Sequence, residues 1–254
     1  MTKPILELKD VKTVVNKGTA NETMILKGIN LKINQGDFIT IVGTNGAGKS
    51  TLFNVIAGNL LIDAGQILHN GEDISKTGEE KRTTFLARVF QDPKLGTAPR
   101  MSVAENMLLA TKRGEKRGLK FRKLKSNMAR FTQLAASMNN GLENRMETAT
   151  GSLSGGQRQA LSFLMATLKR PDILLLDEHT AALDPHTSLS LLKATNERIT
   201  QDHLTALMIT HQLEDAIKYG NRLIVLKDGQ IKADFTGEEK ASLTVNDLYT
   251  FFED

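Results

Sequence analysis

Residues 38–58 read FITIVGTNGAGKSTLFNVIAG, and this stretch determines the kind of fold that the rest of the chain completes. Its first five residues are apolar or β-branched, which is typical of a buried strand. The glycine-rich segment that follows predicts a tight loop, and STLFNVIAG predicts a helix directly after it. A strand, a loop and a helix in this order indicate an α/β protein built on a parallel sheet.

Similar patterns lie on both sides of this stretch. Apolar runs, alternating runs and turn pairs predict strands or hairpins at 5–11, 24–33, 66–74, 173–177, 205–210 and 222–235. Helical patterns cover 102–169, 188–199 and 212–220. No linker divides the chain, so we predict one domain over 1–254. In it, a strand-rich beginning and a helical sub-lobe at about 92–169 are attached to the parallel sheet.

Composition excludes several chemistries. The chain has 254 residues, of which 40% are hydrophobic and 24% charged, and its net charge is +4. These values are ordinary for a soluble globular protein. Cysteine is absent, which rules out disulfides, thiolate metal sites and cysteine nucleophiles. Neither a signal peptide nor an apolar stretch of about 20 residues is present, so any membrane crossing is expected from other chains.

Residues 43–50, GTNGAGKS, match the pattern GxxxxGK[ST], which binds phosphate when it joins a strand to a helix. The loop's backbone N–H groups and the positive end of the helix dipole face phosphate oxygens in such a motif. Lys49 is expected to reach the β- and γ-phosphates, and the Ser50 hydroxyl to bind Mg²⁺. The expected ATP-binding residues are Gly43, Asn45, Gly46, Ala47, Gly48, Lys49, Ser50 and Thr51.

The run ILLLDE, residues 173–178, is an apolar strand that ends in two carboxylates. Alone, it reads as a buried strand with solvated acids at its end. With a phosphate loop upstream, Asp177 is expected to hold Mg²⁺ and Glu178 to position or polarise the attacking water. The pair therefore predicts nucleotide hydrolysis rather than binding alone.

Residues 153–157 read LSGGQ, and here the chain resembles the ATP-binding cassette family over nearly its whole length. Ser154 is a natural N-cap, and the helix that begins there forms a second anion site. The resemblance implies a P-loop NTPase core with an antiparallel β subdomain and a helical signature subdomain. It also implies a homodimer in which Ser154, Gly155, Gly156 and Gln157 of one copy cover the γ-phosphate that the other copy's phosphate loop holds.

Three further residues take their roles from the resemblance. Gln91, in VFQDP, would contact Mg²⁺ and the attacking water. Asp184, which ends AALD, would lie at the dimer interface and communicate between the two nucleotide sites. His211, in MITHQ, would hydrogen-bond the γ-phosphate and help to orient water, which makes it the third expected catalytic residue with Glu178 and Gln91.

The resemblance implies the energy-coupling ATPase of a transporter, with separate transmembrane permease subunits at the cytoplasmic face of the cell membrane. DEHTAALDP, residues 177–185, is similar to a bacterial uptake subgroup with amino-acid substrates, which implies an importer and a solute-binding protein. The alternative is a soluble cassette ATPase acting on nucleic acid or ribosomes. One cassette and no sustained heptad run favour transport, so no nucleic-acid partner is expected.

Two positions depart from the family pattern, and one stretch of the chain is unusually basic. Val15 stands where many members of the family place an aromatic residue against adenine, and His179 stands where a proline commonly follows the catalytic glutamate. Residues 112–130 hold nine Lys or Arg and one acid, Glu115. We read this basic run first as a solvated helical surface, with contact to anionic lipid or to nucleic acid as the alternatives.

Overall fold

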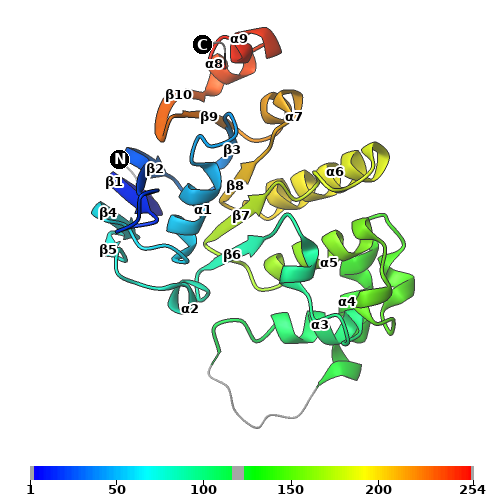
Figure 1. Ribbon diagram of the computed structural model, residues 1–254. Helices are drawn as coiled ribbons and strands as arrows, with labels where there is room; N and C mark the ends of the chain where they lie inside the picture. The colour runs from blue at the N-terminus through cyan, green and yellow to red at the C-terminus, as the bar shows by residue number, and fades with distance from the viewer. Residues whose placement is uncertain (1–2, 116–122, 253–254) are drawn as a thin grey trace. The chain divides into compact units, whose positions relative to one another are not determined.

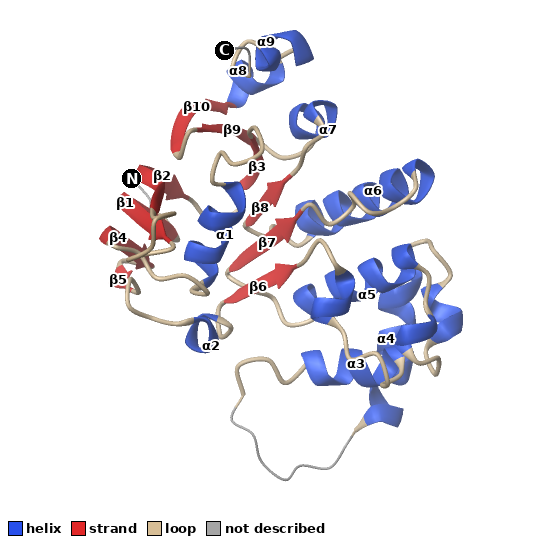
Figure 2. Ribbon diagram, in the orientation of Figure 1, coloured by secondary structure: helices blue, strands red, loops and turns tan. Residues whose placement is uncertain are grey.

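The computed structural model describes residues 3–115 and 123–252. The chain forms two compact units: unit 1 comprises Met1–Arg82 and Leu204–Asp254, and unit 2 comprises Thr83–His203. Most strands belong to unit 1 and the longer helices belong to unit 2 (Figure 2). Within the described ranges, no helix combines the length and apolar character needed to cross a membrane.

Unit 1 contains an antiparallel sheet with the strand order β2-β1-β4-β5. Its strands are β1 (Leu6–Val15), β2 (Thr23–Ile33), β4 (Ala64–His69) and β5 (Glu72–Asp73). The expected hairpin at 66–74 is confirmed, because Asn70 and Gly71 turn the chain with φ values of 49° and 81°. Two consecutive positive φ angles are typical of the tight hairpin turn that an Asn-Gly pair favours.

Unit 1 also holds the strands that follow the order β10-β9-β3-β8, where β3, β8 and β9 are parallel and β10 is antiparallel to β9. They are β3 (Phe38–Val42), β8 (Ala206–Ile209), β9 (Arg222–Lys227) and β10 (Gln230–Thr236). Every residue of β3 and β8 is buried, as expected for parallel strands that are covered on both faces. The helices are α1 (Lys49–Ala57), α2 (Glu79–Arg82), α7 (Leu213–Lys218), α8 (Gly237–Ala241) and α9 (Val245–Tyr249) (Figure 1).

Unit 2 has two parallel strands, β6 (Leu86–Val89) and β7 (Ile173–Asp177), which pair with each other. Its helices are α3 (Val103–Ala110), α4 (Leu124–Ala136), α5 (Gly155–Thr167) and α6 (Pro185–Gln201), with 3₁₀ turns at Pro93–Gly96, Leu142–Arg145 and Thr150–Ser152. The helices close over a core that includes Met107, Phe131 and Phe163, each fully buried. The mainly helical stretch predicted before β7 is therefore confirmed.

The basic run at 112–130 is only partly described, since residues 116–122 lie outside the described residues. Lys112 forms an ion pair with Glu115 at 3.4 Å, which fits a solvated surface. Arg113 differs, because its guanidinium donates hydrogen bonds to the carbonyls of Ala166, at 2.7 Å, and of Lys169. Burial lowers the pKa of Arg113. At least one cation of the run therefore stabilises the C-terminal end of α5 instead of facing solvent.

Candidate nucleotide site

The phosphate loop of unit 1 leaves β3 at Val42 and enters α1 at Lys49. Gly48 is the N-cap residue of α1 and has a left-handed backbone with φ 101°, which favours glycine. No side chain caps this helix start. A Cβ atom on Gly43 would lie 2.2 Å from the carbonyl oxygen of Leu226, so only glycine fits there. The loop is thus shaped by its backbone, as a phosphate cradle requires.

Lys49 is 6% exposed, and its ammonium lies over the loop itself. Its Nζ donates hydrogen bonds to the carbonyl oxygens of Gly43, at 2.8 Å, and Thr44, at 3.1 Å. A buried charge needs such partners. The positive charge predicted for the phosphate-binding loop is therefore held at the first turn of the loop before any anion arrives.

His211 lies at the same sheet edge of unit 1 as the phosphate loop. Strands β3 and β8 are parallel neighbours with Ile41 opposite Ile209, and the N–H of Thr210 donates to the carbonyl of Ile41 at 3.3 Å. The carboxyl ends of parallel strands meet at one edge, where α/β proteins bind ligands. The sequence prediction that His211 follows a buried strand is confirmed, and its distance from a γ-phosphate stays a prediction.

The acidic pair of unit 2 follows β7. Asp177 accepts a hydrogen bond from the guanidinium of Arg88, with 2.5 Å between Nη2 and Oδ2. Glu178 has a positive φ of 46°, an uncommon conformation for a residue other than glycine. Such backbone outliers often mark functional sites. Arg88 was missed in the sequence, because a single arginine in a short strand carries no spacing signal.

Gln91 follows β6, the parallel neighbour of β7. Because Val89 lies opposite Leu176, the strand ends that carry Gln91 and Asp177 share one edge of unit 2. The residue before Gln91 is anchored, since the side-chain amide of Gln159 on α5 donates to the carbonyl of Phe90 at 2.9 Å. Unit 2 therefore brings together the strand ends of the two expected metal-binding residues, Gln91 and Asp177.

The LSGGQ helix α5 begins with a reciprocal cap. The Ser154 hydroxyl accepts from the N–H of Gln157 at 3.2 Å, and the Gln157 side chain accepts from the N–H of Ser154 at 3.4 Å. The sequence prediction of Ser154 as the N-cap is confirmed. The expectation of an open anion site is modified, because this chain's own side chains already satisfy part of the helix end.

Close packing fixes the LSGGQ helix against α6. A Cβ atom on Gly156 would lie 2.3 Å from Cγ2 of Thr187, so glycine alone fits this contact. Asp184 caps α6 by accepting from the N–H of Thr187 at 3.1 Å. Hydrogen bonds from Thr187 to its side chain lower the pKa of Asp184. Thr187 therefore contacts both the LSGGQ motif and the predicted interface residue, and neither contact was visible in the sequence.

His179 follows Glu178 and is 2% exposed. Burial lowers its pKa to about 4, so the imidazole is neutral at physiological pH. Its Nε2 atom has no hydrogen-bond partner among the described residues. The departure from proline at this position therefore places a buried neutral ring next in the chain to Glu178, the expected catalytic residue.

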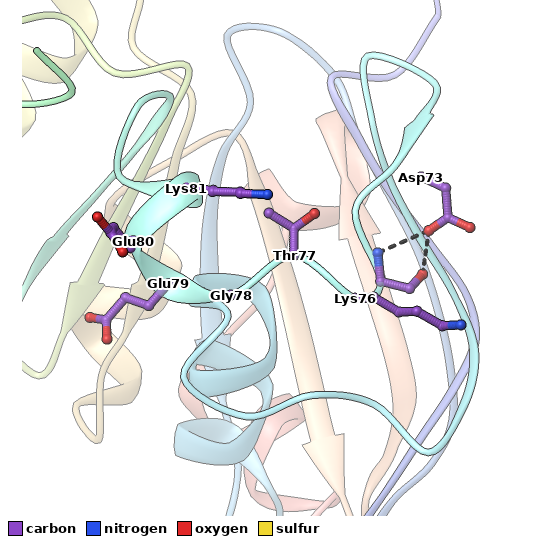
Figure 3. A pocket seen from close by; sticks show the side chains of 8 residues that line it. Asp73, Lys76, Thr77, Gly78, Glu79, Glu80 and Lys81 are labelled. Carbon is purple, nitrogen blue, oxygen red and sulfur yellow. Dashed lines mark hydrogen bonds between the residues drawn. The ribbon is translucent and has the colours of Figure 1, made fainter. Parts of the chain in front are cut away.

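One hollow of unit 1 is separate from these residues. It has a volume of about 700 Å³ and is lined by residues 73 and 75–81, many of them charged (Figure 3). Asp73 accepts from the backbone and the hydroxyl of Ser75 at 2.9 and 2.5 Å, which lowers its pKa to about 2. None of the residues expected to bind nucleotide lines this hollow.

The oxygen donors on the expected metal-binding residues, a hydroxyl, an amide and a carboxylate, are of the kind that Mg²⁺ prefers. No cluster of three or more His, Asp or Glu able to hold a metal occurs in the described parts of the chain. Such a sparse protein ligand set fits an ion that is bound through few carboxylates together with substrate phosphates.

The glycine-rich loop between β3 and α1, its folded-back lysine and the acids at the end of a parallel strand define a P-loop nucleotide-binding protein. Comparison with known proteins narrows this class. The family described as "ABC transporter" matches residues 26–181. The chain belongs to this family and is an ATP-binding cassette ATPase.

Two relatives show how far the similarity extends. The tyrosine transport ATP-binding protein of Clostridioides difficile is 39% identical over 249 residues, which cover 98% of this chain and 99% of that protein. The putative hemin import ATP-binding protein HrtA of Staphylococcus haemolyticus is 31% identical, with 89% of this chain and 99% of that protein covered. Both names describe ATP-binding proteins of transport systems.

Solved structures agree with the fold prediction. The ADP conformation of MJ1267, an ATP-binding cassette of an ABC transporter, matches with a TM-score of 0.77 and 25% identity over 100% of both chains. A dimeric post-hydrolysis state of the cassette MJ0796, bound to ADP and phosphate, matches with a TM-score of 0.76 and 26% identity. That match covers 91% of this chain and 98% of MJ0796.

Proposed function

We propose that this chain hydrolyses Mg-ATP at composite sites in a homodimer and thereby drives an importer of amino acids or similar small solutes. The observation that carries the hydrolytic part is that the chain has both a phosphate loop, in unit 1, and an acid pair at a parallel strand end, in unit 2. A cradle for phosphate and carboxylates for metal and water are the parts that phosphoryl transfer requires.

The proposed roles follow the chemistry of each side chain. Lys49 and the loop amides bind the β- and γ-phosphates, and the oxygens of Ser50, Gln91 and Asp177 hold Mg²⁺. Glu178 and His211 orient and polarise the water. Mg²⁺ itself would neutralise the charge that develops on the phosphates.

Dimer formation completes the site in this proposal. The LSGGQ motif of one copy, Leu153–Gln157, covers the γ-phosphate bound to its partner, and Asp184 lies at the interface. The dimeric cassette MJ0796 supports this arrangement by similarity. ATP then joins the two copies, and hydrolysis releases them.

The transport role rests on similarity. We propose separate permease subunits in the membrane, this chain at their cytoplasmic face, and a solute-binding protein that delivers the substrate. The relative from Clostridioides difficile, covered over 99% of its length, supports an aromatic or other amino acid as the substrate. Co-purification from a membrane extract tests the assignment, because recovery of a multi-spanning protein with this chain is expected and its absence would contradict the transport role.

Glu178→Gln tests hydrolysis directly. The amide keeps the size of the side chain but cannot polarise water as a carboxylate does, so turnover should fall at least about 100-fold while ATP binding persists. Size-exclusion chromatography with ATP is expected to show a trapped dimer. Normal turnover by this variant would remove Glu178 from the catalytic role.

A further inference from the structure

Arg88 contacts the carboxylate that the proposed function assigns to Mg²⁺. Its Nη2 lies 2.5 Å from Oδ2 of Asp177, and the two side chains are only 12% and 14% exposed. Strand pairing sets this contact, because Arg88 lies opposite Leu175, two residues before Asp177 on the parallel strand β7. A charge-assisted hydrogen bond with so little solvent is much stronger than a surface ion pair.

The arginine is itself held in place. Its guanidinium carbon lies 5.0 Å from the centre of the Phe90 ring, a cation–π contact on the same face of β6. The carbonyl of Phe90 accepts from Gln159, which is 1% exposed on α5. The Phe90 ring therefore braces the guanidinium, and Gln159 of the LSGGQ helix in turn anchors the backbone of Phe90.

A fixed positive charge at this place affects any cation that approaches Asp177. The guanidinium carries a positive charge and occupies one carboxylate oxygen. It therefore repels a divalent ion and competes with it for the same lone pairs. In a partly buried site this repulsion is several times stronger than it would be in water.

We propose that Arg88 is a built-in counter-ion of Asp177, which weakens the binding of Mg²⁺ alone and makes metal binding depend on nucleotide. The triphosphate brings negative charge that offsets Arg88, so the metal and the nucleotide enter together. This inference rests on the proposed role of Asp177 as a magnesium ligand. Arg88 is a positioning residue in this account, because it acts through Asp177.

The test measures metal binding rather than turnover. Mn²⁺ replaces Mg²⁺ as the probe, and its binding to the full chain is followed by electron paramagnetic resonance, with and without a non-hydrolysable ATP analogue. Arg88→Met is expected to lower the Mn²⁺ dissociation constant without nucleotide about tenfold, because one adjacent positive charge is lost. The gain with the analogue present should be smaller, since the phosphates already offset the charge.

Three variants serve as controls. Arg88→Lys keeps the charge and should stay within about threefold of the wild type. Arg145→Met removes one positive charge from an exposed position of unit 2 and should change nothing. Asp177→Asn removes the proposed ligand and should abolish the nucleotide-dependent metal signal. If Arg88→Met does not fold, Arg88→Gln removes the same charge while keeping a hydrogen-bond donor.

The outcomes distinguish the counter-ion inference for Arg88 from the proposed metal role of Asp177. If Asp177→Asn abolishes the signal while the neutral variants of Arg88 bind Mn²⁺ like the wild type or more weakly, the counter-ion inference is wrong and the role of Asp177 stands. If Asp177→Asn binds metal and nucleotide like the wild type, the metal role of Asp177 in the proposed function is wrong, and the inference falls with it.

Discussion

The two glycine-flanked helix starts of this chain differ in how they are capped. Helix α1 of unit 1 starts after Gly48 with no side-chain cap, and Lys49 folds back over the preceding loop. Helix α5 of unit 2 starts after Ser154 with both hydrogen bonds of a capping box. Both ends carry the positive side of a helix dipole, yet only the first is left without a protein cap.

This difference indicates an order of events. The start of α1 suits an anion in a single copy of the chain, because no side chain caps it. At the start of α5 the N–H of Gln157 is already bonded to the Ser154 hydroxyl, so fewer first-turn N–H groups remain for a phosphate than at α1. Nucleotide should therefore bind to α1 first, and the LSGGQ motif should join only when a second copy brings it to the bound phosphates.

The largest expected effect is on nucleotide affinity, at the uncapped start of α1. Lys49→Ala removes a buried ammonium whose charge-assisted bonds are worth about 2–3 kcal/mol, so nucleotide affinity should fall on the order of 100-fold. Calorimetric titration with ATP in the absence of turnover measures this loss. Lys76→Ala is the matched control, since Lys76 lines the separate hollow of unit 1. Unchanged affinity in Lys49→Ala would remove Lys49 from the site.

Variants of Ser154, at the capped start of α5, allow effects on stability to be separated from effects on dimer formation. Ser154→Ala loses the N-cap and should reduce the unfolding free energy by about 1 kcal/mol. Ser154→Asp keeps a good cap but places a negative charge where the proposed γ-phosphate lies. It should therefore retain stability while the Glu178→Gln background no longer dimerises with ATP. Urea unfolding and light scattering give the two readouts.

A dimer that persists with Ser154→Asp would contradict the inference that the LSGGQ motif joins the phosphates bound by a second copy. In that case the LSGGQ end of α5 does not face a triphosphate, and the capping box is only a structural start of the helix. A loss of stability with Ser154→Asp would leave the dimer readout uninformative about charge, so Ser154→Thr, which keeps a neutral cap, is the companion variant for the same assay.

Much of this contrast was visible in the sequence, because each helix start depends on local residue chemistry. The loop GTNGAGKS predicted a backbone cradle, and Ser154 at the start of the next helical pattern predicted an N-cap. Most of the strands and both hairpin turns followed from apolar runs and from the Asn-Gly and Asp-Gly pairs, whereas β6 (Leu86–Val89) was not predicted. These features need only neighbours within a few positions along the chain.

The contacts that the sequence did not reveal join distant positions. Arg88 reaches Asp177, 89 positions away in the sequence, across the pairing of β6 with β7. Arg113 caps α5 from 53 positions away, although the surrounding charges suggested only a solvated surface. Such pairs depend on strand register and helix packing, and a single sequence carries no pattern that fixes either.

Packing of α5 against α6 behind the capped helix start also affects stability. Gly156→Ala would place a methyl group 2.3 Å from Cγ2 of Thr187, and overpacking of this kind costs about 1–3 kcal/mol. Thr187→Ser removes that methyl group while keeping the hydroxyl. The double variant should therefore recover most of the lost unfolding free energy, as a double-mutant cycle would measure. If the losses of unfolding free energy in the two single variants simply add, the contact with Thr187 is not the reason for glycine at position 156.

The last comparison concerns the C-terminal ends of α5 and α7. Arg113 caps α5 in unit 2, whereas in unit 1 the buried Lys240 donates to the carbonyls that end α7, those of Ile217, Tyr219 and Gly220, at 2.7–2.9 Å. Burial lowers the pKa of Lys240 from 10.5 to about 8. The guanidinium cannot lose its proton, so only the cap in unit 1 should respond to alkaline pH.

The direction in which the unfolding free energy changes with pH follows from proton binding to Lys240. Between pH 8 and 10.5 the unfolded chain keeps the proton on Lys240 longer than the folded chain does. The contribution of Lys240 to the unfolding free energy should therefore become more favourable as pH rises, by at most about 1.4 kcal/mol per pH unit. Urea unfolding of the wild type and of Lys240→Met at pH 7.5, 8.5 and 9.5 measures the difference. Parallel curves would mean that the three carbonyls hold the ammonium protonated, and that both helix caps carry a permanent charge.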